Sequence, residues 1–516
     1  MLPQDITGDE KHACDARSGG LYKMNNVKTA ASQIQQPSLK KNYILSTIRL
    51  ALSFALPLVT FPYVSRILGS VGIGKVEFAN SVVAYFVVFT GLGIPNYGMR
   101  LVAREKSDIR RLSKSVAELS LILLFTVIAG YAVYFILLWA VPDFRSERLL
   151  FLLVSPSIFL SDFNFEWFYQ GIEDQKFITV RYIIIKILQL ACIFLFVRER
   201  SQYLLYAGLL VGMNSLSTLF NIFHLRKCLV KIPFRNLEIR PHLKPVLLIF
   251  ASNIAVSVYT NLDVIMVGFF CGDEKVGLYT AANRIVRIVI AVVTAFCAVI
   301  VPRIESSLKN GDIEGYRRYV NLSLGYILIL AVPCCLGLVA LADDIIMVFA
   351  GTEFAPAAFS MRLLSPVIII VGVAYFVGLQ LLYSHREEWK YTVSVSVAAV
   401  VNAFFNAVLI PRFAQDGAIA GTLIAEGTGL LVQIVFAWKY LRETDFMSIN
   451  TLKYVLAGVI MFMAVRLMPE LSSRILRCAL CIGLGAAVYG TGLLLMREKM
   501  AWKVMGKLTG KIRSVE

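Results

Sequence analysis

Apolar runs of about 20 residues recur along the chain from residue 43 to residue 496, separated by short polar segments. A helix of about 20 apolar residues is long enough to cross a hydrocarbon layer of about 30 Å. A transmembrane β-barrel would instead show segments of about 10 residues with alternating polarity, and the sequence has none. The pattern therefore predicts an all-α polytopic membrane protein.

The apolar windows predict about 14 transmembrane helices, bounded by clusters of charge and by proline or glycine. The predicted spans are residues 43–64, 76–98, 116–140, 149–170, 177–197, 203–225, 243–270, 278–302, 319–341, 361–383, 389–411, 417–440, 451–468 and 477–496. Residues 1–42 are polar and lack the apolar core of a signal peptide, so we expect a disordered cytoplasmic tail, with Met24 as an alternative start. Residues 497–516 are expected to form a basic cytoplasmic tail.

Composition agrees with a membrane location, because 58% of the residues are apolar and 16% are charged, against about 45–50% and about 25% in soluble domains. The net charge of +17 could indicate a nucleic-acid partner. However, lysine and arginine gather in alternate connections, which hold about three times as many of them as the other connections do. This asymmetry favours a multi-pass orientation with both termini cytoplasmic, and no nucleic acid is expected as a partner.

A short internal repeat predicts how the spans are grouped. The segments "GKVEFAN" (74–80) and "GLYTAAN" (277–283) share the pattern Gly-x4-Ala-Asn, and each opens the second span of its half. Six spans per repeat leave both halves in the same orientation, as in parallel repeats of transporters. The expected parts are a six-helix bundle (43–225), a cytoplasmic linker (226–242), a second six-helix bundle (243–440) and two extra transmembrane helices (441–496).

Of the ionisable residues inside the predicted spans, nine are candidates for function, because each costs at least about 2.5–3.5 kcal/mol unless it faces a partner or water. They are Arg49, Lys186, Arg284, Arg287, Arg362, Asp162, Glu166, Asp263 and Glu426. Because both signs occur in both halves, we expect a wet central cavity between the two bundles.

The basic residues are the candidates for binding an anion. Arg284 and Arg287 are three residues apart and share a helix face, and a guanidinium grips phosphate with two hydrogen bonds. The alternative is a salt bridge from one of them to Asp263, which lies at a similar depth. Lys186 lies too near the middle of its span to reach the interface easily, whereas Arg49 could do so.

The acidic residues are candidates for a polar lining or for binding a coupling cation. Asp162 and Glu166, in "SDFNFEWFYQGIED" (161–174), are four residues apart and are predicted to share a helix face. The alternative is a helix-end ion pair, with Trp167 and Tyr169 as anchors at the membrane interface. Glu426 lies among small residues, where one buried hydrogen bond would also explain it.

Four stretches resemble the bacterial polysaccharide flippases, the Wzx-type translocases of O-antigen and capsule repeat units, in the multidrug/oligosaccharidyl-lipid/polysaccharide exporter superfamily. They occur in family order within residues 43–496. The stretches are "FPYVSRILGSVGIGKVEFANSV" (61–82) running into "GLGIPNYGMR", "FEWFYQGIEDQKFITVR" (165–181), "NLDVIMVGFF" with "VGLYTAANRI", and "LIPRFAQDGAIAGTLIAE" (409–426).

The resemblance implies a transporter that moves an undecaprenyl-diphosphate-linked oligosaccharide from the cytoplasmic to the outer leaflet of the bacterial inner membrane. It implies no organic cofactor, a coupling ion such as H⁺ or Na⁺, and contact with membrane lipids and with the polysaccharide polymerase and chain-length machinery. The residues expected to bind the diphosphate or glycan are Arg49, Lys186, Arg284, Arg287, Asn80 and Asn283. Those expected to line the path or couple the ion are Asp162, Glu166, Asp263 and Glu426.

Two other functions are weighed against this one. A cation-coupled multidrug exporter of the same superfamily would favour carboxylates and aromatic residues in its cavity, whereas the buried charges here lean basic. A membrane enzyme such as a glycan polymerase would need a sizeable outer loop, and the longest one predicted, residues 342–360, is short. No catalytic motif or metal-ligand spacing appears, so neither a catalytic site nor a metal site is expected.

Overall fold

The computed structural model describes residues 39–442, 444, 449–498 and 500–502. These residues form helices joined by short loops and contain no β-strand, which confirms the predicted all-α class. In chain order the α-helices are α2 (Leu39–Gly91), α3 (Ile94–Glu105), α4 (Ile109–Ala140), α5 (Pro142–Ser146), α6 (Arg148–Val154), α7 (Pro156–Asp162), α8 (Glu166–Gly171), α9 (Gln175–Phe196), α10 (Tyr203–Cys228), α11 (Arg240–Cys271), α12 (Asp273–Lys309), α13 (Ile313–Phe349), α14 (Ala357–Leu364), α15 (Val367–Tyr375), α16 (Glu388–Leu441), α17 (Ile449–Arg466) and α18 (Arg474–Leu495). Short 3₁₀ turns are η1 (Arg200–Gln202), η2 (Phe234–Asn236) and η3 (Thr352–Phe354), and η4 (Phe376–Leu382) is a π-helix.

Ten helical stretches of the described residues are long and apolar enough to cross a membrane, so the chain is a multi-pass membrane protein. The predicted number of 14 spans is not confirmed. Two of the ten, α2 and α16, contain 53 and 54 residues and each covers two predicted spans. Each has one residue with non-helical dihedrals, Gly69 (φ 71°) in α2 and Ala414 (φ 50°) in α16, where the helix direction changes.

By residue contacts the chain divides into two compact units. The described residues of unit 1 are 39–57, 82–197 and 204–254; those of unit 2 are 58–81, 198–203 and the described part of 255–502. The two predicted six-helix bundles with their linker and two extra helices stay a prediction. The predicted tails lie outside the described residues, except that residues 39–42 begin α2 and residues 497, 498 and 500–502 follow α18.

The aromatic motif after residue 164 forms the core of unit 1. Trp167, Phe168 and Tyr169 of α8 are buried with apolar side chains of α3 and α4. Two glycines allow α8 to approach α3 closely, because a Cβ on Gly98 would lie 2.6 Å from the Trp167 ring and a Cβ on Gly171 would lie 2.6 Å from Val102. The expectation that Trp167 and Tyr169 anchor the membrane interface is therefore wrong, because packing takes these side chains into the interior. The ion pair expected at the helix end in the same alternative does form, at Glu166.

In unit 2, the two glycines of the predicted repeat lie at one helix crossing. A Cβ on Gly74 of α2 would lie 1.7 Å from the carbonyl oxygen of Asp273, and a Cβ on Gly277 of α12 would lie 2.1 Å from the carbonyl oxygen of Ser70. Each glycine thus contacts the backbone of the other helix. Without side chains between them, the helices come close enough for residues one turn further along to meet.

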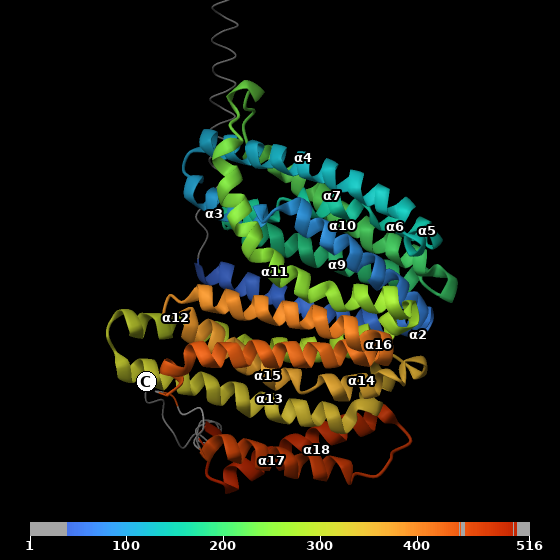
Figure 1. Ribbon diagram of the computed structural model, residues 1–516, viewed down its shortest axis with the longest axis vertical. Coiled ribbons are helices and arrows are strands. Elements are labelled where there is room, and N and C mark those ends of the chain that lie inside the picture. Colours follow the sequence, from blue (N-terminus) through green and yellow to red (C-terminus); the bar gives the residue numbers. More distant parts are fainter. Residues whose placement is uncertain (1–38, 443, 445–448, 499, 503–516) are drawn as a thin grey trace, which may run out of the picture. The chain divides into compact units, whose positions relative to one another are not determined.

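The last two helices of unit 2, α17 and α18, pack against each other and against α13 (Figure 1). An ion pair joins α18 to the end of α13, with Arg477 Nη1 3.0 Å from Asp344 Oδ2. Asp344 is buried, so this pair is better shielded from solvent than a surface pair.

A hydrogen-bonded cluster surrounds the break in α2. The carboxylate of Glu353, in η3, accepts hydrogen bonds from the backbone N–H and the hydroxyl of Ser70 at 2.9 and 3.0 Å, and from Arg200 at 2.7 Å. A Cβ on Gly69 would lie 2.6 Å from a Glu353 oxygen, so a larger residue would clash with this carboxylate. The positive φ of Gly69 also favours glycine at this position. The cluster ties together three loops of unit 2 that are predicted to lie on the outer side.

We expect Gly74→Ala and Gly277→Ala each to lower the free energy of unfolding by about 1–3 kcal/mol or more, because the added methyl group meets backbone that cannot rotate away. Thermal unfolding of the purified protein in detergent would measure the loss. Gly337→Ala is the matched control, since a Cβ there has no atom within 4 Å. Equal unfolding temperatures for all three variants and the parent would contradict the close crossing.

The Glu353 cluster predicts a pH dependence. Partial burial pushes the pKa of Glu353 upward, but the hydrogen bonds from Ser70 and the charge of Arg200 outweigh it, so the pKa lies below its usual value of 4.5. A carboxyl group with a lowered folded-state pKa contributes stability above the unfolded-state pKa, and this contribution is lost as the pH falls through the folded-state value. We expect Glu353→Gln to unfold at a lower temperature than the parent at pH 7, with the gap closing below pH 4.5. A gap that is unchanged at pH 3.5 would speak against this assignment.

Candidate functional site

The structure places the predicted site residues in both units. Arg49, Lys186, Asp162 and Glu166 belong to unit 1, whereas Asn80, Arg284, Arg287, Asn283, Asp263 and Glu426 belong to unit 2. Unit 2 holds the largest set and is described first.

The close crossing of α2 and α12 brings Arg284 to Glu77. Arg284 Nη2 lies 2.7 Å from Glu77 Oε1, and its guanidinium lies 4.5 Å from the centre of the Phe61 ring. Both charged side chains remain about one quarter exposed. A partly exposed ion pair stacked on an aromatic ring fixes the direction of the guanidinium while leaving it open to a competing anion.

Arg287 lies one turn further along α12 and is exposed. Its Nε donates a hydrogen bond of 3.3 Å to Asn283 Oδ1. Among the described residues, no carboxylate forms an ion pair with it. Arg287 and Arg284 therefore offer two guanidinium groups on one helix, of which Arg287 keeps an uncompensated charge. Asn80, on α2, is half-buried.

Asp263 of α11 is buried and is held by uncharged donors. It accepts hydrogen bonds from Tyr279 Oη at 2.6 Å, Asn406 Nδ2 at 2.6 Å and Thr422 Oγ1 at 2.8 Å. Asn406 also donates to Asn402 Oδ1 at 3.2 Å. The predicted alternative of a salt bridge from Asp263 to Arg284 or Arg287 is wrong, because Arg284 pairs with Glu77 and Asp263 forms no ion pair within the described part of the chain.

Further polar atoms surround this carboxylate. Asn406 Oδ1 and Asn402 Nδ2 are buried and have no hydrogen-bond partner within the described residues. Thr422 Oγ1 also donates to the carbonyl oxygen of Ala418 at 3.0 Å. The carboxylate thus stands in a buried group of oxygen atoms from α11, α12 and α16. Glu426 lies further along α16, half-buried and close enough to Tyr391 to interact electrostatically.

In unit 1, Glu166 joins two arginines. It pairs with Arg49 of α2, and Arg181 Nη2 of α9 lies 3.2 Å from its other oxygen. Arg181 is buried and also donates to Asn221 Oδ1 of α10. Glu166 therefore connects three helices, and most of its hydrogen-bonding capacity is already used.

The helix that was predicted to carry Asp162 and Glu166 on one face is broken between them. Helix α7 ends at Asp162, Phe165 has a φ of 54°, and α8 begins at Glu166, whose N–H donates to Asn164 Oδ1 at 2.7 Å. The prediction of a shared face is wrong, because the Asn164 side chain starts a new helix. Asp162 lies buried against Gly91 instead, and its Oδ2 has no hydrogen-bond partner in the described structure.

Lys186 is half-buried on α9, where its ammonium group donates to Gln189 Oε1 at 2.8 Å. No carboxylate pairs with it among the described residues. Arg362, another of the nine ionisable residues, pairs with Asp343.

Sequence reasoning missed several members of these groups. Glu77 and Arg181 lie near the ends of predicted spans, where a charge is not unusual. Tyr279, Asn406 and Thr422 are uncharged at neutral pH, and the search for charge inside the spans passed over them. The spacing of Asn402 and Asn406, four residues apart in an apolar helix, could have indicated a polar helix face.

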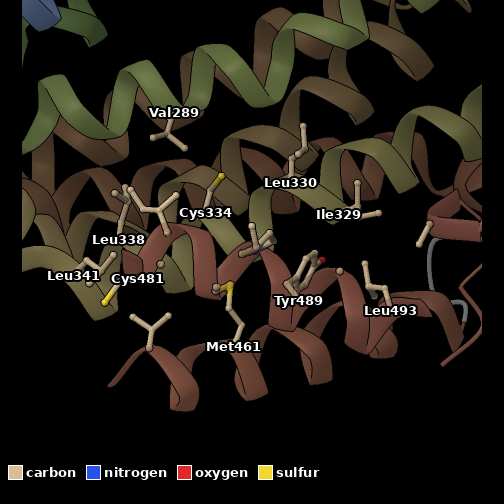
Figure 2. Close-up of a pocket in the computed structure, with 18 of the residues that line it drawn as sticks. Val289, Ile329, Leu330, Cys334, Leu338, Leu341, Met461, Cys481, Tyr489 and Leu493 are labelled. Carbon is tan, nitrogen blue, oxygen red and sulfur yellow. The ribbon is translucent and has the colours of Figure 1, made fainter. Parts of the chain in front are cut away.

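An apolar groove of about 700 Å³ lies between α13 and the last two helices of unit 2 (Figure 2). Its walls include Ile329, Leu338 and Cys334 of α13, Met461 of α17 and Tyr489 of α18. Val289 of α12 also lines it, two residues after Arg287 along the chain. The volume and the apolar lining of the groove suit a long hydrocarbon chain. Helix α12 forms part of the groove wall and also carries the two guanidinium groups.

Two family models match the chain. The model of the polysaccharide biosynthesis protein family matches residues 39–308, more than half of the chain, and the model described as lipid II flippase MurJ matches residues 183–476. A protein of Escherichia coli strain K12 that carries the name O-antigen transporter is 24% identical over 399 residues, covering 75% of this chain and 94% of that protein. A protein of Rhizobium tropici that carries the name lipid II flippase MurJ is 26% identical over 293 residues, covering 52% and 53%.

Solved structures share the fold. An inward closed form of the lipid II flippase MurJ superposes with a TM-score of 0.64 at 17% identity, covering 89% of this chain and all of the other. An inward-facing multidrug transporter of the MATE family superposes with a TM-score of 0.61 at 16% identity, covering 76% and 95%. The chain belongs to the polysaccharide biosynthesis protein family, in agreement with its motifs.

Proposed function

We propose that this protein is a flippase that moves an undecaprenyl-diphosphate-linked oligosaccharide from the cytoplasmic to the outer leaflet of the bacterial inner membrane by alternating access. The product would serve the synthesis of a surface polysaccharide, O-antigen or capsule. One observation carries the proposal: α12 presents two guanidinium groups and, two residues further on, forms part of the wall of a long apolar groove. A polar anion attached to a hydrocarbon chain needs both kinds of contact, and α12 supplies them on different faces, since residues two apart in a helix do not face the same way.

The diphosphate would bind Arg287 and compete with Glu77 for Arg284. Guanidinium and phosphate form charge-assisted hydrogen bonds, often two at a time. Asn283 already orients Arg287, and Phe61 orients Arg284. Asn80 and Asn283 supply amide groups of the kind that hydrogen-bond sugar hydroxyls.

The polyprenyl chain would occupy the apolar groove. The lining side chains that are labelled in Figure 2 are aliphatic, aromatic or sulfur-containing. Tyr489, one of them, is buried. An aliphatic chain would gain about 25 cal/mol for each Å² of apolar surface removed from water. Within the membrane, however, that gain is small, because the hydrocarbon chain is already surrounded by apolar lipid. The groove therefore positions the chain more than it adds to binding affinity.

Asp263 is the group that we propose to bind the coupling cation, H⁺ or Na⁺. A buried carboxylate without a positive partner is costly, and its three neutral donors offset only part of that cost. Binding a proton or a sodium ion would remove the negative charge. The hydroxyl oxygen of Thr422 and the amide oxygens of Asn402 and Asn406 lie around the Asp263 carboxylate. Oxygen is the ligand atom that hard cations prefer.

The remaining expectations follow from this function. We infer a location in the inner membrane with both termini cytoplasmic, and a transport role without catalysis. Arg49, Glu166 and Asp162 would serve as polar lining or as structural ties of unit 1, and Lys186, whose ammonium meets no carboxylate there, as an additional anion contact. The polysaccharide polymerase and the chain-length machinery would receive the translocated glycan.

The test is a sidedness assay on inverted membrane vesicles that carry labelled undecaprenyl-diphosphate oligosaccharide in the outward-facing leaflet. The parent protein should move the glycan into the lumen. Arg284→Ala with Arg287→Ala should lower the rate at least tenfold, the factor that corresponds to about 1.4 kcal/mol, since charge-assisted hydrogen bonds contribute about 1.5–3 kcal/mol. Arg303→Ala, on the same helix at the exposed position 303, is the matched control.

Near-normal movement by the double variant at normal protein level would sink the anion-site assignment. If no oligosaccharide moved while a cationic dye did, the multidrug-exporter alternative would replace the flippase.

We expect Asp263→Asn to abolish the dependence of transport on an ion gradient, because the amide cannot exchange a proton or neutralise a cation. Transport would be compared with a sodium gradient, with a pH gradient and with neither. Asp343→Asn, at an exposed carboxylate that pairs with Arg362, is the control. A variant at position 263 that still responds fully to the gradient would rule out Asp263 as the coupling group.

A further inference from the structure

A second groove, of about 420 Å³, lies in unit 1 between α9 and α10. Most of its wall is apolar and is formed by the side chains of Phe177, Val180, Ile184 and Ile185 of α9 and Phe220 of α10. Asp174 and Lys176 close one end. The groove thus has an apolar length and one charged end, which is the pattern of a lipid molecule.

The groove opens on an exposed apolar surface of unit 1, which we expect to face lipid. Val180, Ile184 and Phe220 are 46%, 57% and 50% exposed, and both α9 and α10 belong to candidate membrane spans. Large apolar side chains exposed at mid-helix are expected to face hydrocarbon. An acyl chain from the bilayer can therefore enter the groove from the side.

The charged end is basic. Lys176 is exposed and forms no ion pair within the described residues. His224 of α10 stacks on Phe177 with ring centres 4.1 Å apart and lies 3.8 Å from Asp174, so the last turn of α10, with exposed Arg226 and Lys227, reaches the same end. Lys176 is therefore the cation that lines this end, and Arg226 and Lys227 lie on the neighbouring helix turn.

The carboxylate of Asp174 does not cancel this charge. It caps α9 by accepting a hydrogen bond of 3.1 Å from the N–H of Phe177, and it faces His224. Arg181, which also lines the groove, is occupied by Glu166 and Asn221. Lys176 is thus left to attract an anion from the membrane surface, and the exposed Arg226 and Lys227 add positive charge on the neighbouring turn of α10.

We propose that this groove is a binding site for an anionic phospholipid of the leaflet on the predicted cytoplasmic side, with one acyl chain along α9 and the headgroup phosphate at Lys176. Basic pockets between helices on the cytoplasmic side recognise anionic headgroups in this way. The site is separate from the transport site of the proposed function and does not rest on it.

The test is native mass spectrometry of the full-length protein, purified in detergent and equilibrated with equal amounts of dioleoyl phosphatidylglycerol and dioleoyl phosphatidylcholine. The two lipids share their acyl chains and differ in headgroup charge. The parent protein should retain phosphatidylglycerol preferentially. Lys176→Gln should lower that preference about fivefold, the factor for about 1 kcal/mol per basic residue near a charged surface.

Ile184→Trp should fill the groove and lower the retention of phosphatidylglycerol, whereas Ile187→Trp should not. Ile187 lies on the same helix, is 59% exposed and does not line the groove. Equal retention of the two lipids by the parent, or equal effects of the two tryptophan variants, would overturn the proposal. Displacement of phosphatidylglycerol by undecaprenyl diphosphate in the parent but not in Ile184→Trp would also overturn it, because the groove would then hold a polyprenyl substrate.

Discussion

The cost of placing charge among apolar helices constrains this molecule more than any other interaction. The structure meets that cost in three ways. Glu77 and Arg284 form an ion pair that remains partly exposed, Glu166 lies between two arginines, and Asp263 has only neutral donors. The first two arrangements compensate charge within the protein. The third leaves a negative charge without a positive partner, and for this reason Asp263, rather than Glu166, is suited to bind and release a cation.

The same reasoning separates the two arginines of α12. Arg284 has a carboxylate and an aromatic ring as neighbours, whereas Arg287 has one amide oxygen and open surroundings. A phosphate that approaches α12 would meet Arg287 first and would exchange with Glu77 at Arg284 afterwards. The ion pair to Glu77 keeps Arg284 extended and ordered in the absence of substrate, which lowers the entropy that binding would otherwise have to remove.

The hydropathy pattern was sufficient to predict the all-α class, because a membrane span leaves a long and unambiguous apolar run. Site residues were predicted less completely. Arg284 and Asp263 were recognised from their depth in the membrane. Depth says nothing about rotation around a helix axis, so it could not decide between an anion site and the alternative salt bridge to Asp263, which proved wrong. The shared face of Asp162 and Glu166 failed because a single side chain, Asn164, ended one helix and began the next. Uncharged members of the sites, such as Thr422, give no signal in a search for charge.

The crossing of Gly74 and Gly277 has a consequence for how this chain can evolve. Each glycine touches a peptide group of the other helix and not a side chain. A larger residue at one position cannot be accommodated by a smaller residue at the other, because a carbonyl oxygen cannot be made smaller. Substitutions at the two positions should therefore not compensate each other, and in related sequences both glycines should be retained independently rather than covary.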